Sequence, residues 1–162
     1  MKKFFVLILF LSLNSCRYFN VSPVNGITTK DLTEKPKTIQ FIGKWKLDKF
    51  SYDLINQNGY EIKTVELNIK SDGSFELKNF PNFIDVFTKS KTKEYLNVGG
   101  NWKIGKNFSD ENWVLGLNFE KSSLYRNGFA MDFELYEEKG KIILWYFVGD
   151  PDSGERLLFR KE

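Results

Sequence analysis

Residue types that commonly perform catalysis are scarce in this chain of 162 residues, which has no histidine and one cysteine, Cys16. A Ser-His or Cys-His pair, in which imidazole activates the nucleophile, is therefore excluded. An internal disulfide and a Cys/His zinc site are excluded as well. The remaining acid–base candidates are the carboxylates of Asp48, Asp53, Asp132 and Glu134. No pattern positions two of these carboxylates together, so we interpret them as a solvated strand face and expect no enzymatic activity.

An acidic stretch at 150–155, Asp-Pro-Asp-Ser-Gly-Glu, could bind calcium or form a turn. It is too short for an EF-hand-type loop, and Gly154 stands where a third oxygen ligand would be needed. A turn explains each residue, because proline presets φ, aspartate hydrogen-bonds nearby backbone and glycine adopts positive φ. We therefore predict a hairpin turn here, with no bound metal, and we predict no cofactor elsewhere.

The first residues have the pattern of a secretory signal, with Lys2 and Lys3 before an apolar run at 4–13. About ten apolar residues are too few to span a membrane, which takes roughly 20. The segment Leu13-Asn14-Ser15-Cys16 resembles a bacterial lipobox. The resemblance implies a signal peptide over 1–15 and acylation of Cys16 with chains such as palmitate, which would hold the protein on a membrane. The alternative is an ordinary signal peptide with an incidental cysteine.

The residues after Cys16 bear on localisation. Arg17 stands where an aspartate favours inner-membrane retention in enteric bacteria, so the lipoprotein resemblance implies the outer membrane. The acidic run that marks many surface-exported lipoproteins of the Bacteroidetes type is missing, so we expect the protein to face the periplasm. The formal net charge of +3 includes Lys2 and Lys3, which the signal peptide would remove. The remaining charge is close to neutral and gives no support for binding nucleic acid.

Residues 16–38 form a polar segment with Pro23, Gly26 and Pro36, which we interpret as the lipidated N-terminus and a flexible linker. An extra edge strand over 18–24 is the alternative. Residues 39–162 are then the folded domain.

Alternation of apolar and polar residues dominates this domain, and aromatic residues are abundant, with 16 Phe, 7 Tyr and 4 Trp. Strands are predicted over 43–50, 64–70, 75–80, 101–104, 112–119 and 129–137, and as the two arms of a hairpin in 141–162. No helical period of useful length competes, although 81–97 could hold a short helix or a lid carrying Phe83, Phe87, Lys89, Lys91 and Lys93. Short connections imply antiparallel neighbours. We therefore predict an all-β fold: one up-and-down antiparallel barrel, or a strongly curved sheet, of about eight strands.

Gly43-Lys44-Trp45 at the start of the first strand resembles the Gly-x-Trp signature of lipocalins. The region 43–160 as a whole is similar to lipocalin-like domains of small bacterial lipoproteins. The resemblance implies structural roles for Gly43 and for Trp45, which would close the barrel floor beneath a basic residue of the last strand. That residue would be Arg160 or, less readily, Arg156, placed over the aromatic face.

Two functions follow from such a barrel. In the first, a small apolar ligand binds in the interior, and the lining residues would be Trp102, Trp113, Phe133 and Tyr146. In the second, the core is filled and the outer surface binds an envelope protein, as an inhibitor, immunity factor or accessory subunit would. A cavity of a few hundred Å³ favours the first function, and a closed core with an exposed apolar patch favours the second.

The lipid anchor predicts the behaviour of a Cys16→Ala variant. Without the thiol, the protein should lose acyl labelling and leave the membrane fraction, as measured by metabolic labelling and cell fractionation. Ser15→Ala keeps a small residue before the cysteine and is the matched control, which should stay acylated. A Cys16→Ala protein that remains on the membrane would contradict the anchor.

Overall fold

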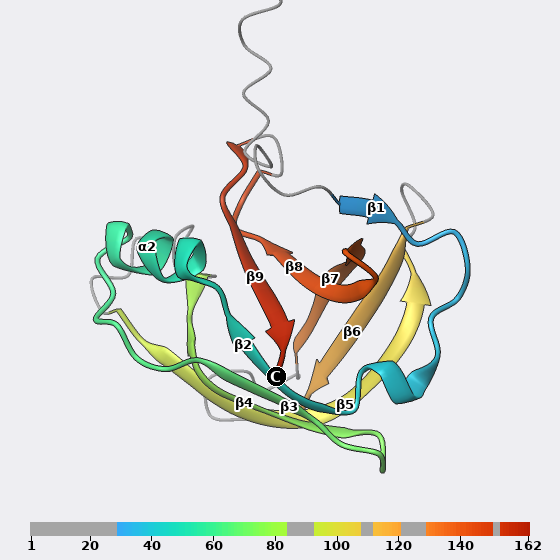
Figure 1. The fold of residues 1–162 in the computed structure, drawn as a ribbon. Coiled ribbons are helices and arrows are strands. Elements are labelled where there is room, and N and C mark those ends of the chain that lie inside the picture. Colours follow the sequence, from blue (N-terminus) through green and yellow to red (C-terminus); the bar gives the residue numbers. More distant parts are fainter. Residues whose placement is uncertain (1–28, 84–92, 108–111, 121–128, 151–152) are drawn as a thin grey trace, which may run out of the picture.

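Eight antiparallel strands in the described part of the chain close into a barrel, and a ninth, short strand lies against its wall (Figure 1). The computed structural model describes residues 29–83, 93–107, 112–120, 129–150 and 153–162. The barrel strands are β2 (Gly43–Leu47), β3 (Glu66–Ile69), β4 (Ser74–Pro81), β5 (Tyr95–Lys106), β6 (Trp113–Phe119), β7 (Phe129–Glu138), β8 (Lys141–Phe147) and β9 (Arg156–Lys161). The predicted all-β, up-and-down antiparallel barrel is confirmed.

Strands that follow one another in the chain pair around the barrel, and β9 joins the two ends of this meander. On one edge β9 pairs with β8, where Phe159 lies opposite Leu144. On the other edge it pairs with β2, where Phe159 lies opposite Leu47. Without β9, both β2 and β8 would present open edges with unpaired backbone groups. The last strand therefore turns a curved sheet into a barrel.

The short strand β1 (Thr29–Asp31) pairs with residues 136–138 of β7. The pairing of β6 with β7 ends at Glu134, so β1 occupies the edge of β7 beyond that point. β1 lies within the 16–38 segment predicted to be a linker, and the alternative strand at 18–24 lies outside the described residues, as does Cys16.

A helix that the sequence analysis did not predict follows β2. The first strand, expected over 43–50, ends at Leu47, and α2 (Lys49–Gln57) begins directly after Asp48. The Asp48 carboxylate accepts a hydrogen bond from the Ser51 backbone N–H at 2.9 Å, which is the usual arrangement of a helix N-cap. Leu54 and Ile55 are buried one turn later on the same face as Ser51. The helix has only nine residues, which is too short for a clear helical repeat of apolar positions. The alternation of apolar and polar residues before Asp48 suggested that the strand continued past this residue.

Four predicted strands are confirmed within two residues at each end, as β3, β4, β6 and β7.

A bulge in β4 lets side chains from both odd and even positions of the strand face the interior. Leu77 pairs with Val98, whereas Phe80, three residues later, pairs with Leu96, two residues earlier. Side chains of a regular strand alternate between faces, so Phe80 would otherwise point outward. The extra residue turns it into the core, where it is 1% exposed.

The strand expected over 101–104 is longer in the structure because β5 runs through Gly99 and Gly100. Gly100 pairs with Phe75 on one side and Phe119 on the other. A Cβ atom built on Gly100 would lie 2.0 Å from the Asn118 carbonyl oxygen. The close approach of β6 to β5 therefore requires glycine at this position.

Gly100→Ala should destabilise the barrel by about 1–3 kcal/mol, because overpacking of a well-packed site typically costs that much. Gly105→Ala is the matched control on the same strand, since no atom lies within 4 Å of its Cβ position. Urea denaturation of both variants measures the difference. Equal midpoints for the two variants would contradict the close approach at Gly100.

Candidate functional site

Aromatic rings from four strands meet at the centre of the barrel. The Phe80 ring centroid lies 5.5 Å from that of Tyr146 and 6.5 Å from that of Phe159. The Phe133 centroid lies 5.5 Å from Tyr146 and 5.6 Å from Phe159. These separations and tilts are those of packed aromatic pairs. One cluster therefore links β4, β7, β8 and β9 across the interior.

Most inward-facing side chains in and around this cluster have almost no accessible surface, whereas Tyr146 is half-buried. Phe133 and Phe159 are 0% exposed. The same value holds for the surrounding leucines, Leu67, Leu77, Leu115, Leu117, Leu144 and Leu157. A chamber able to hold water or a ligand would leave accessible area on the side chains that line it. At the level of these residues the barrel is filled, as in an ordinary close-packed core.

The residues that were expected to line one interior pocket, Trp102, Trp113, Phe133 and Tyr146, all belong to or pack against one hydrophobic core cluster. Phe133 and Tyr146 belong to the central cluster. Trp102 is half-buried, and its indole N–H donates to the Lys70 carbonyl at 3.0 Å. Trp113 is also half-buried, with the Lys106 ammonium 5.4 Å from its ring centroid. In the described structure these side chains therefore contribute to a packed core, with the Trp102 ring 6.3 Å from that of the buried Phe41.

Trp45 anchors the start of β2. Its indole N–H donates to the Phe41 carbonyl at 2.8 Å, and the two rings stack with centroids 6.3 Å apart. Both residues are fully buried. Gly43, between them, has a φ of 130°, which lets the chain enter the strand directly after the 3₁₀ turn η1 (Thr38–Gln40).

Arg160 has partners other than the Trp45 ring expected from the sequence. In the pairing of β2 with β9, Trp45 lies opposite Lys161, whereas Arg160 lies opposite Lys46. Because side chains alternate between the faces of a strand, Arg160 lies on the outer face and Trp45 points inward. The expected stacking between them is replaced by an ion-pair network outside the barrel.

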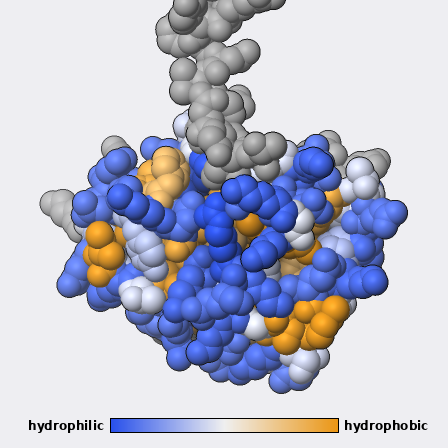
Figure 2. Space-filling model, in the orientation of Figure 1, coloured by the Kyte–Doolittle hydropathy of each residue, from blue (hydrophilic) through white to orange (hydrophobic). Residues whose placement is uncertain are grey.

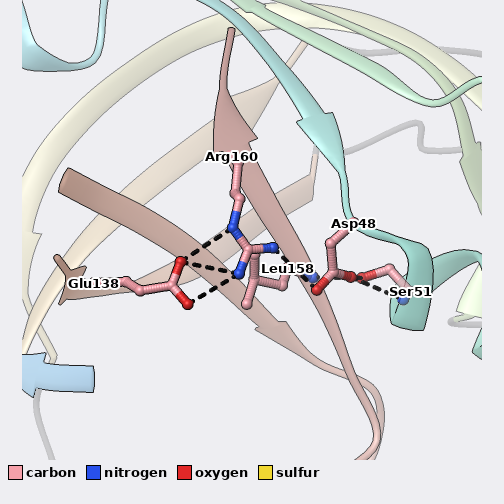
Figure 3. Close-up of polar contacts among 5 residues, drawn as sticks. All are labelled: Asp48, Ser51, Glu138, Leu158 and Arg160. Atoms are coloured by element: carbon pink, nitrogen blue, oxygen red, sulfur yellow. Dashed lines mark hydrogen bonds and ion pairs between the residues drawn. The ribbon is translucent and has the colours of Figure 1, made fainter. Parts of the chain in front are cut away.

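In this network Arg160 lies between two carboxylates (Figure 3). Its Nε and Nη2 atoms donate to the Glu138 carboxylate at 2.9–3.1 Å, and Nη1 donates to Asp48 at 3.2 Å. The two-pronged contact with Glu138 is the geometry that arginine makes best. The carboxylates are mostly buried, with side chains 15% exposed for Asp48 and 19% for Glu138. The network thus joins the start of α2 to β7 and β9.

Ser51 connects the same network to the backbone of β9 (Figure 3). Its hydroxyl donates to Asp48 Oδ1 at 2.6 Å and accepts from the Leu158 N–H at 2.8 Å. The Asp48 N–H donates to the Leu158 carbonyl at 3.0 Å. The first turn of α2 therefore continues the pairing along β9 after β2 has ended at Leu47.

Arg156, the other arginine considered for Trp45, lies between two different rings. Its guanidinium carbon is 4.7 Å from the Trp145 centroid and 4.9 Å from the Phe50 centroid. It is 2% exposed, and burial lowers its pKa, although arginine remains charged in proteins. Arg156 thus packs α2 against the outer side of β8 as a cation between aromatic faces.

The acidic stretch after β8 has turn geometry in its described residues. The Ser153 N–H and hydroxyl both donate to the Asp150 carbonyl, at 3.0 and 2.7 Å. Gly149 and Gly154 have φ angles of 82° and 72°. Among the residues that the structure describes, no group of three or more potential ligands could hold a metal ion.

Part of the predicted lid lies outside the described residues, namely Phe87, Lys89 and Lys91. Lys93 is described, and its ammonium lies 5.0 Å from the Tyr60 ring centroid. Phe83 is buried against Tyr60, with centroids 5.3 Å apart. Phe83 and Tyr60 thus pack together beside β5, and the exposed Lys93 lies over the Tyr60 ring.

The face shown in Figure 2 is mostly hydrophilic, with small and separate apolar patches. The large apolar side chains exposed in the described chain are Ile39, Phe50 and Ile62. Lys46–Glu162 and Lys70–Glu76 form ion pairs on the wall. No helix in the described residues is long and apolar enough to cross a membrane.

The outer surface is hollowed around the turn between β7 and β8. A cleft of about 470 Å³ lies between residues 31–40 and this hairpin. A recess of about 270 Å³ lies on the side of the hairpin that faces β9 and is lined by Lys139, Lys141 and Lys161. These lysines were not predicted from the sequence as site residues. The pattern that could have indicated them is the Lys139-Gly140 turn with charged residues on both sides.

Comparisons of the chain with protein-family models, curated proteins and solved structures returned no match.

Ser51→Ala should destabilise the protein by about 1–3 kcal/mol, because the buried Leu158 N–H would lose its acceptor. Thermal and urea unfolding measure the loss. Ser153→Ala removes an exposed hydroxyl and should leave stability nearly unchanged. A Ser51→Ala protein as stable as the Ser153→Ala protein would contradict the role given to Ser51.

Proposed function

We propose that this protein is a non-enzymatic lipoprotein of the cell envelope whose barrel binds an envelope protein through its outer surface. Such a module would serve as an inhibitor, an immunity factor or an accessory subunit. The filled interior is the observation that carries this proposal.

Binding of a small apolar ligand needs interior volume, and ligand pockets usually occupy about 300–1,000 Å³. The described interior offers Phe80, Phe133 and Phe159 in mutual contact, with exposures of 0–1%. A ligand could enter only if this cluster separated, which would sacrifice aromatic contacts and close packing. The carrier function expected from the sequence is therefore the less favoured of the two.

The outer wall of the described residues carries few large exposed apolar side chains. They are Ile39, Phe50 and Ile62, so the closed core, and not a large apolar patch, is what supports a protein partner. Two clefts beside the β7–β8 hairpin make this part of the surface concave. A polar surface with isolated apolar side chains suits a reversible partner, since non-obligate interfaces are about as apolar as the rest of a protein surface.

The membrane part of the proposal rests on the lipobox-like segment ending at Cys16. Acylation there would place the barrel at the membrane surface, and the residues that follow favour the periplasmic side of the outer membrane. The near-neutral charge of the mature chain supports a protein partner over nucleic acid.

The test is mass spectrometry of small molecules extracted from purified protein that begins at Arg17 and keeps every described strand. We expect no apolar compound at a level near one per chain, because the core is filled. Extracts of the same column fractions from cells lacking the protein are the control. A reproducible lipid or apolar metabolite at that level would overturn the proposal and restore the carrier function.

A further inference from the structure

The recess beside the β7–β8 turn combines lysines with a hydrophobic base. Its volume is about 270 Å³, and three exposed lysines line it: Lys139, Lys141 and Lys161. The half-buried Ile142 and the buried Ile143 lie between them. We call this feature the lysine recess.

The carboxylate that borders the lysine recess is already engaged. Glu138 accepts three hydrogen bonds from Arg160 and therefore does not neutralise the lysines. In the described structure Lys139 and Lys141 have no ion-pair partner, and the Lys161 ammonium donates to the Gln40 carbonyl at 2.9 Å.

The charges around the recess do not balance. The Arg160 network includes Asp48 as well as Glu138 and carries one negative charge, so three lysines leave a net charge of +2. Two other wall lysines are paired, Lys46 with Glu162 and Lys70 with Glu76. The residues that line the recess therefore carry an excess of positive charge, and Glu162, which lines the adjacent hollow, is paired with Lys46.

The backbone of the turn gives a second, independent observation. Lys139 has a φ of 50° and Gly140 a φ of 76°, the conformation of a two-residue hairpin turn. Asn, Asp or Gly normally occupies the first of these positions, because other side chains are disfavoured at positive φ. A lysine here costs local stability and places an ammonium group at the recess.

The recess has an extension and lies beside the point where the chain enters the barrel. An adjacent hollow of about 330 Å³ shares Lys141, Ile142 and Lys161, so a ligand could extend past its charged group. Thr29, the first described residue, pairs with Glu138 at the edge of the recess. Extended chain covers ~3.3–3.6 Å per residue, so the segment from Cys16 to Thr29 could reach at most about 45 Å.

We propose that the lysine recess binds a phosphate-type anionic group. The oxygens of the group accept hydrogen bonds from Lys139, Lys141 and Lys161, and the isoleucines contact the attached carbon atoms. Two sources offer this chemistry: the headgroup of an anionic phospholipid and a soluble phosphorylated compound. The headgroup source rests on the proposed anchor, whereas the binding chemistry does not.

The first experiment titrates the chain beginning at Arg17 with inorganic phosphate and follows backbone amide chemical shifts. We expect shifts confined to residues 139–141 and 161, and a dissociation constant at least tenfold weaker in the double variant Lys139→Asn, Lys141→Gln. Lys103→Gln, which removes an exposed lysine of β5, is the matched control and should stay within twofold of the unchanged protein. Asparagine suits the turn, so melting of the Lys139→Asn single variant at or above the original temperature would show that the fold is intact.

The second experiment measures flotation with phosphatidylcholine vesicles, with and without phosphatidylglycerol. Binding to the anionic vesicles that the double variant loses would support the recess and identify a headgroup as the source. Phosphate binding without vesicle binding would support the recess with a soluble ligand. Equal phosphate affinity in the double variant, or shifts spread over all exposed lysines, would overturn the proposal. The titrated chain lacks Cys16, so failure of the anchor would leave these results unaffected.

Discussion

The pairing of β9 with both β2 and β8 is the constraint on which the rest of the structure depends. It removes the two open edges of the meander and satisfies their backbone groups. Residues on the inner face of β9, such as Phe159, complete the central aromatic cluster. Residues on its outer face, Leu158 and Arg160, receive the first turn of α2 and the two carboxylates. Both the core and the outer network are therefore assembled on the last strand of the chain.

The filled interior moves any binding chemistry to the outer wall. A barrel of eight strands has an interior just wide enough for side chains to fill or for one small ligand. Here phenylalanine occupies that space, and the bulge in β4 adds Phe80 to it. The barrel then acts as a rigid support, and loops, turns and outward side chains remain for recognition. The arginine network and the lysine recess both lie on this support, around the β7–β8 turn.

A large part of the architecture could be predicted from alternation and turn residues. Strands such as β6 and β7 have apolar residues at every second position, and Lys139-Gly140 marks the turn after β7, so antiparallel pairing of neighbours could be predicted. The absence of histidine and the single cysteine likewise restricted the possible chemistry through composition alone. These conclusions need only local patterns, because a period of two and a turn are properties of consecutive residues.

The placement of individual side chains depended on contacts between distant segments. In the pairing of β2 with β9, Trp45 lies opposite Lys161 and Lys46 lies opposite Arg160. Because neighbouring residues of a strand face opposite sides, this register places Arg160 on the outer face, away from Trp45. A shift of one residue in strand pairing exchanges the two faces, and local sequence does not specify that shift. The start of α2 could not be predicted for a related reason. The Ser51 hydroxyl there accepts a hydrogen bond from the Leu158 N–H, which is more than a hundred residues later in the chain. Composition and period thus determine that a barrel forms, whereas the register of its closing strand determines which residues meet.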